Sequence, residues 1–137
     1  VASGGELARI MLAMKNVLCD YCGKPTRFVD DSIVYGRSFG MIYYCRECRA
    51  WVGVHRGTDQ PLGRLADAEL RKYKKAAHAA FDPIWRRGQT TRRAAYKWLA
   101  AQLGIPEQET HIGMFDVAQC KQAIAVCKKR MEGFYHE

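Results

Sequence analysis

Residues 19–22 read CDYC and residues 45–48 read CREC, so two CxxC pairs stand 22 residues apart in the chain. Two residues between thiolates let one tight turn direct both sulfur atoms at the same ion, and Zn²⁺ takes four such ligands tetrahedrally. The intervening residues suffice for two short strands and a turn. We therefore predict one structural zinc ion, held by Cys19, Cys22, Cys45 and Cys48.

Buried free thiols and a pair of disulfides are the alternative interpretations of these cysteines. Isolated core thiols have no reason to recur as two CxxC pairs. Residues 1–18 lack the basic, apolar and small-residue order of a signal peptide, so we expect a reducing, cytoplasmic compartment in which disulfides are rare. Four thiolates also close the coordination shell and leave no position for an activated water, which favours a structural over a catalytic ion.

Charge is the most informative feature of the composition. The 137 residues contain 22 Lys and Arg against 14 Asp and Glu, a net charge of +8. A basic protein with a zinc site makes nucleic acid the first partner to consider, although many basic proteins are merely soluble. No run of 18 apolar residues occurs, so we expect no membrane partner.

The residues around the CxxC pairs predict a small antiparallel sheet. Residues 26–29, 32–35, 41–44 and 50–55 have strand-like composition, and Asp30 and Asp31 form a turn signal between the first two. Aromatic residues on these strands, Trp51 among them, are expected to serve mainly as core or cover. The metal would join the ends of this sheet.

Three helices are predicted after the loop at residues 57–63. The first runs from a cap at Asp67 to Phe81 and is stopped by Pro83. The second begins near Thr90 or Thr91, buries Trp98, Leu99 and Leu103, and ends at Gly104. The third begins at Asp116, with Gln119 completing a capping box. The connection from residue 104 to residue 115 is too long for a helix-turn-helix.

Two further cysteines fall in the last predicted helix. Cys120 and Cys127 lie seven residues apart on its apolar stripe, with Val117, Ile124 and Met131. At 1.5 Å per residue they are about 10 Å apart, too far for a disulfide or a shared ion. We therefore expect both to be buried thiols.

The N-terminal residues 1–16 predict an amphipathic helical extension. Residues 3–9, SGGELAR, resemble the signature motif of ABC-type ATPases, above all the version in the bacterial DNA-repair ATPase RecN. In those ATPases the motif acts with the Walker A loop of a partner, and this sequence has no GxxxxGK[ST] segment. We expect no nucleotide cofactor and no ATPase activity from this chain alone. Met14 is a second candidate start, in which case residues 1–13 are an upstream extension or fusion.

Three further segments carry a resemblance over most of the chain. Residues 54–63 (VHRGTDQPLG), 76–85 (AAHAAFDPIW) and 111–116 (HIGMFD), together with the CxxC pairs, resemble a largely uncharacterised zinc-finger-containing domain family of bacteriophages, prophages and their bacterial hosts. The resemblance spans residues 17–132. It implies zinc binding and an origin in a phage or bacterium, and it carries no established activity.

The predicted architecture is α+β. A small antiparallel zinc-ribbon-like sheet precedes three helices, and an N-terminal helical extension precedes the sheet. We divide the chain into the extension at residues 1–16, a zinc-ribbon-like module at 17–57, and a helical region at 58–137 packed on it.

The predicted function is nucleic-acid binding. Residues 64–97 contain ten Lys and Arg against three Asp and Glu, and phosphate contacts need long cationic side chains on a folded scaffold. The expected contacts are Arg71, Lys72, Lys74, Lys75, Arg86, Arg87, Arg92 and Arg93.

Two other functions stay open. A protein-interaction adaptor would present Trp51, Trp85 or the N-terminal helix to a partner protein. A metal-dependent nuclease would need a second site built from three histidine–aspartate pairs. Ordinary packing, hydrogen bonding and helix capping are the alternative explanations of these residues. These pairs are His55 with Asp59, His78 with Asp82, and His111 with Asp116. No nuclease motif accompanies them, so we do not expect an enzyme.

Overall fold

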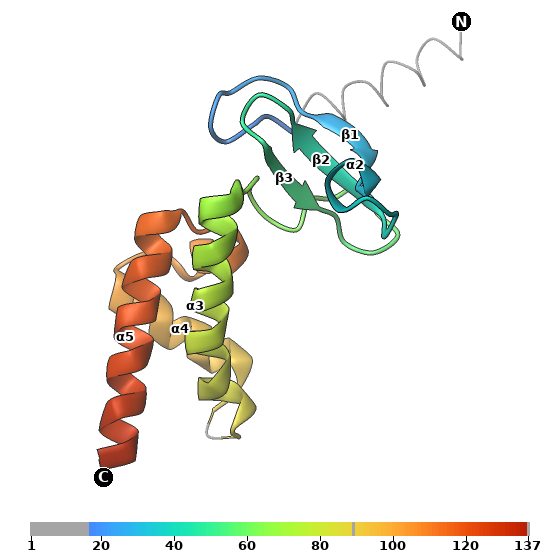
Figure 1. Ribbon diagram of the computed structural model, residues 1–137. Helices are drawn as coiled ribbons and strands as arrows, with labels where there is room; N and C mark the ends of the chain where they lie inside the picture. The colour runs from blue at the N-terminus through green and yellow to red at the C-terminus, as the bar shows by residue number, and fades with distance from the viewer. Residues whose placement is uncertain (1–16, 89, 137) are drawn as a thin grey trace, which may run out of the picture. The chain divides into compact units, whose positions relative to one another are not determined.

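The computed structural model describes residues 17–88 and 90–136, which form two compact units. The first unit extends to Ala68 and the second begins at Glu69. Figure 1 shows the strands of the first unit and the helices of the second. The predicted N-terminal helix, the ATPase-like residues 3–9 and the alternative start at Met14 lie outside the described residues.

The first unit is built on a three-stranded antiparallel sheet. Strands β1 (Arg27–Asp30), β2 (Met41–Cys45) and β3 (Ala50–Gly53) follow one another in the order β1-β2-β3 (Figure 1). Phe28 lies opposite Tyr43, and Tyr43 lies opposite Val52, so the three side chains share one face. Tyr43 is buried there, with its ring centroid 4.8 Å from that of Phe28. The α+β class and the zinc-ribbon-like sheet are confirmed.

The segment after β3 returns to the sheet. Val54 bridges to Pro61, and Trp51 exchanges two backbone hydrogen bonds with Ala66, at 3.1 and 3.0 Å. The Leu65 amide also donates to the Asp20 carboxylate at 2.7 Å. The predicted boundary lay after residue 57, whereas the chain divides after Ala68 because these bonds hold the returning segment in the first unit.

The strand predicted at residues 32–35 is wrong. Ser32–Tyr35 is the short helix α2, because Asp30 and Asp31 are used differently from a simple turn. The Asp30 carboxylate accepts from the Ser32 amide at 2.8 Å and from the Ser38 hydroxyl at 2.6 Å, and the Ser38 bond, with Ser32, holds the pKa of Asp30 below its usual value. Such local side-chain bonds offer the backbone an alternative to strand pairing.

Helix α3 (Ala68–Arg86) is longer than predicted. We expected Pro83 to end it at Phe81, but the helix continues through the proline by one further turn. A proline has a helix-compatible φ and removes one N–H donor, so it lowers the stability of a helix without always ending it. Here the residues beyond it are held by packing, because Ile84 is buried next to Phe81 in the core of the second unit.

The caps of α4 (Arg92–Leu103) and α5 (Val117–His136) agree with the prediction. Thr91 accepts a hydrogen bond from the Ala94 amide at 3.0 Å, and Gly104 ends α4 with a φ of 67°. Asp116 and Gln119 bond each other's backbone amides at 2.8 and 3.0 Å, a complete capping box. The connection between the two helices contains the 3₁₀ helices η1 (Glu107–Glu109) and η2 (Ile112–Met114).

The buried face of α4 differs from the predicted one. Only Leu99 of the three expected residues is fully buried, and the rest of the buried face consists of Ala95 and Ala100. Trp98 is half-buried, and the Arg130 guanidinium lies 4.6 Å from its ring centroid. Small side chains let packed elements approach closely, so alanines fill the core where a larger residue was expected.

Cys120 and Cys127 are buried thiols, as predicted. Burial raises the pKa of Cys127 to about 12, so this thiol stays protonated and unreactive at neutral pH. No helix within residues 17–88 and 90–136 combines the length and apolarity required to cross a membrane.

The Asp31 carboxylate gives a stability prediction for the first unit. It is 6% exposed and accepts from the amides of Phe39 and Gly40 at 2.8 and 3.3 Å. Asp31→Ala leaves both donors without their acceptor, so we expect the free energy of unfolding of the zinc-loaded protein to fall by about 1–3 kcal/mol.

Urea unfolding measures this change. Asp31→Asn keeps one oxygen acceptor and is the matched control, with a smaller loss expected. An Asp31→Ala protein as stable as the original chain would contradict the assignment of this carboxylate as the anchor of the loop at residues 36–40.

Candidate metal centre and basic surface

Two turns position the four cysteines. In the first, Cys19 donates its amide to the Lys24 carbonyl at 2.8 Å and accepts from the Gly23 amide at 2.9 Å. Gly23 has a φ of 74°, a conformation that glycine adopts without steric cost. In the second, Cys45 ends β2, and Cys48 lies in the turn that leads into β3. The antiparallel pairing of β2 and β3 therefore fixes the second turn at the end of these two strands.

The four sulfur atoms form a compact group. All lie within 4.8 Å of one another, and the Sγ atoms of Cys22 and Cys45 are 3.7 Å apart. Zn–S bonds of 2.3 Å in a tetrahedron require S–S separations of about 3.8 Å, so one ion fits among these sulfurs with little adjustment. A disulfide is not formed at this separation.

Burial controls the protonation of the thiols. It raises the pKa of Cys45 and raises that of Cys48 to about 12, whereas the Lys24 backbone amide lowers the pKa of Cys22. Without a cation, the Cys45 and Cys48 thiols therefore stay protonated at neutral pH. Zinc binds thiolates, so it must displace these protons, and its apparent affinity falls as the pH falls.

The sulfurs also belong to the core of the first unit. Cys19 and Cys45 are each 3% exposed and pack with the main apolar cluster, which contains Tyr43, Ala50, Val52 and Leu65. Four thiolate ligands leave no open coordination position. The cluster is therefore the site of one structural zinc ion, as predicted from the CxxC pairs.

Comparison with protein families agrees with this geometry. The model of a family described as a zinc-finger-containing domain matches residues 15–130, most of the chain. The protein belongs to this zinc-finger-containing domain family. No curated protein and no solved structure matches the chain significantly.

The predicted basic residues fall into two groups on the second unit. Arg71, Lys72, Lys74 and Lys75 lie on the first half of α3, where Lys72 and Lys75 are exposed and Arg71 is half-buried. Lys74 donates to the Gly113 carbonyl at 2.6 Å, so its ammonium group is used to hold the connection between α4 and α5.

The second group includes two arginines that lie over Trp85. Arg86 and Arg87 end α3 or follow it directly, and Arg92 and Arg93 begin α4. The guanidinium groups of Arg86 and Arg92 lie 5.3 and 5.9 Å from the Trp85 ring centroid. We call Trp85 with these four arginines the hairpin-tip cluster. The sequence indicated the positive charge of this cluster, but it did not indicate that Arg86 and Arg92 lie over the same indole ring.

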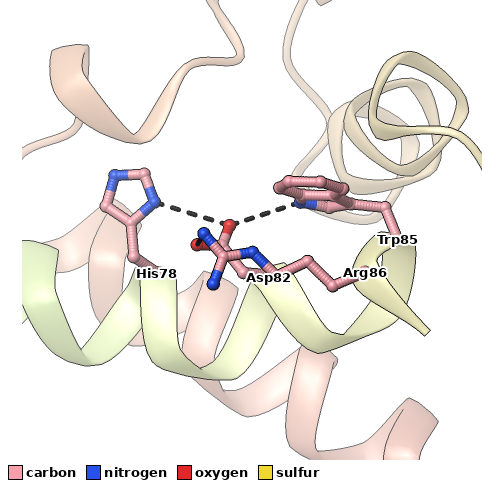
Figure 2. A network of polar contacts seen from close by, with 4 residues as sticks. All are labelled: His78, Asp82, Trp85 and Arg86. Carbon is pink, nitrogen blue, oxygen red and sulfur yellow. Dashed lines mark hydrogen bonds and ion pairs between the residues drawn. The ribbon is translucent and has the colours of Figure 1, made fainter.

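Asp82 orients this cluster. Figure 2 shows its carboxylate between His78 and Trp85. The indole N–H of Trp85 donates to Oδ1 at 3.3 Å, Arg86 lies 3.7 Å from Oδ2, and His78 Nδ1 lies 3.7 Å from Oδ1. These contacts follow from spacings of three and four residues on one helix, which bring the side chains to the same face.

The other histidine–aspartate pairs have separate local roles. The His111 ring lies 5.4 Å from the Tyr96 ring centroid, whereas the Asp116 carboxylate caps α5. His55 is exposed and contributes backbone bonds to a turn, in which the Asp59 carbonyl accepts from the Tyr43 hydroxyl at 2.6 Å. In the described part of the chain, the cysteine cluster is the only group of three or more metal-binding side chains.

Removing zinc should affect the two units differently. A chelator, or Cys22→Ser at the exposed ligand, removes the ion that joins the two turns, so we expect loss of the β1–β2–β3 amide resonances in a ¹⁵N spectrum. The α3–α5 resonances should persist, because the helices form a unit of their own.

Two measurements accompany the spectrum. Elemental analysis should give one zinc ion per chain, and added zinc should restore the sheet after chelation. Lowering the pH should release zinc, since protons compete for the thiolates. A metal-free chain that keeps the sheet resonances would contradict a structural role for the ion.

Proposed function

We propose that this protein binds nucleic acid through its second unit. The observation that carries the proposal is the hairpin-tip cluster, in which Arg86 and Arg92 lie over Trp85. The Arg86 side chain is 67% exposed, and Arg87, Arg92 and Arg93 are exposed beside it. Guanidinium groups bind phosphates in a fork geometry, and an aromatic ring stacks on bases, so the cluster offers both contacts that nucleic acid requires.

The distribution of charge supports the choice of unit. Residues 69–136 contain 13 Lys and Arg against six Asp and Glu, whereas residues 17–68 contain seven against six. Four thiolates with one Zn²⁺ add two further negative charges to the first unit. Attraction to phosphates therefore comes from the helices, and the zinc unit contributes little to it.

The biological setting is part of the proposal. We place the protein in the cytoplasm of a bacterial host cell, as an accessory protein of a phage or mobile element, on the strength of the sequence resemblance. We propose a binding role without catalysis, because His78 and Asp82 belong to the network that orients Trp85, and Asp116 belongs to a helix cap.

A protein-interaction adaptor is the second candidate, and one observation on the first unit favours it. Phe39 is 67% exposed and Tyr35 52% exposed, and Tyr35 lies edge-on to both Phe39 and Trp51 at centroid distances of 6.0 and 6.1 Å. Exposed aromatic groups of this kind occur at protein interfaces. Trp51 was one of the residues that the sequence suggested for this role.

Replacing Arg86 and Arg87 tests the nucleic-acid proposal. We expect Arg86→Ala/Arg87→Ala to weaken binding to a labelled 20-nucleotide DNA by about tenfold at low salt and to reduce the slope of log K against log[salt] by about one to two. Fluorescence anisotropy at several salt concentrations gives both quantities.

Arg46→Ala/Arg56→Ala is the matched control. Both residues are exposed on the first unit, and the substitution changes the net charge by the same amount. We expect less than a twofold change in affinity from it. Equal losses from the two double variants would remove the hairpin-tip cluster from the site, and no binding by the original chain would favour the adaptor.

A further inference from the structure

A hollow of about 520 Å³ lies beside α4 in the second unit. One wall is the α4 face that carries Arg92, Arg93, Tyr96 and Lys97, and the opposite wall is the connection that carries Gln108 and His111. Arg92 and Tyr96 are four positions apart, as are Arg93 and Lys97, so each pair shares a strip of α4, and the three cations all line the hollow. Arg92 and Arg93 were predicted phosphate contacts, whereas the other residues of the lining were not predicted as a site.

Aromatic rings are fixed at the hollow. Tyr96 packs on the buried Phe81 with ring centroids 4.4 Å apart, and His111 lies 5.4 Å from it on the other wall. Burial raises the pKa of Tyr96, and the Ile112 backbone hydrogen-bonds its hydroxyl, so the ring stays neutral and held in place. The Arg92 guanidinium lies 5.5 Å from the same ring.

The lining selects the class of ligand. The cations Arg92, Arg93 and Lys97 disfavour a purely apolar ligand. A simple inorganic anion would make no use of the aromatic rings. Glu107 lowers the net charge of the lining to about +2 and can accept a hydrogen bond from a base amino group. A phosphate attached to a planar, hydrogen-bonding ring uses every part of the lining, and a nucleotide has this chemistry.

Arg92 also joins the hollow to the hairpin-tip cluster. Its guanidinium lies near both the Trp85 ring, at 5.9 Å, and the Tyr96 ring, at 5.5 Å. A nucleic-acid strand whose backbone follows Arg92 therefore passes from the Trp85 indole to the hollow. The bases of a duplex are stacked and paired, so only an unpaired base can leave the strand and enter it.

We propose that this hollow binds one unpaired nucleotide and makes the protein selective for single-stranded nucleic acid. The inference rests on the proposed function and specifies its substrate. The strand phosphate lies against Arg92, Arg93 and Lys97, and the base lies in the hollow beside Gln108 and His111.

Lys97→Ala/Gln108→Ala tests the site, because both residues are exposed and neither belongs to the hairpin-tip cluster. Gln102→Ala/Lys129→Ala removes the same two side-chain types at exposed positions outside the hollow and is the matched control. Anisotropy is measured with a 12-nucleotide single strand and with the same sequence as a duplex. Circular dichroism verifies that each variant is folded.

We expect Lys97→Ala/Gln108→Ala to weaken single-strand binding by about tenfold, because it removes one phosphate contact and one hydrogen-bonding side chain, with less than a twofold change for the duplex. The control should change neither. Equal losses for single strand and duplex, or none for either, overturn the hollow while leaving the proposed function in place. Failure of the original chain to bind either form overturns both.

A mononucleotide titration gives an independent test. Adenosine 5′-monophosphate added to ¹⁵N-labelled protein should shift the amides of residues 92–97 and 107–111, and adenosine without phosphate should shift them less at equal concentration. Shifts located elsewhere, or none at 20-fold excess over about 1 mM protein, overturn the site.

Discussion

The tetrahedral preference of Zn²⁺ for four thiolates is the constraint on which the first unit depends. A three-stranded sheet of four or five residues per strand buries little apolar surface, and sheets of this size need another source of stability. The ion supplies it by joining a turn before β1 to a turn between β2 and β3, and Cys19 and Cys45 place the metal site within the apolar cluster. Apparent binding energies of about 10–16 kcal/mol for structural zinc exceed the stability of most small domains, so metal binding and folding of this unit are one process.

The second unit depends on a different interaction, the packing of helices whose ends are capped. Phe81, Leu99, Ile112 and Phe115 are fully buried, and the predicted caps at Thr91, Gly104 and Asp116 are present. The charged side chains are therefore free to occupy the outer faces. This separation explains how one chain can keep a nearly neutral metal-binding unit beside a strongly basic helical one.

The predictable features were those that depend on short spacings. The CxxC pairs, the caps at Thr91 and Asp116 and the glycine stop at Gly104 each involve residues within four positions, where the sequence fixes the geometry. Ser32–Tyr35 was missed because its conformation depends on bonds that span eight positions, from the Ser38 hydroxyl to Asp30 and from the Phe39 amide to Asp31. Pro83 was misjudged because tertiary packing of Ile84 outweighs the cost of the proline. The Trp85 cluster and the hollow at Tyr96 join residues on separate elements, so only the positive charge of their surface was visible beforehand.

The hydrogen bond from Trp85 to Asp82 has a consequence for discrimination between base sequences. An indole has a single donor, and here that donor is already used within the protein, at 3.3 Å from the carboxylate. A base resting on this ring would contact only its π face. Purines and pyrimidines both stack on such a face, and they differ only in the area of the stacked rings. In the proposed complex with nucleic acid, the bond to Asp82 would leave Trp85 able to stack on a base but without a donor for a base edge.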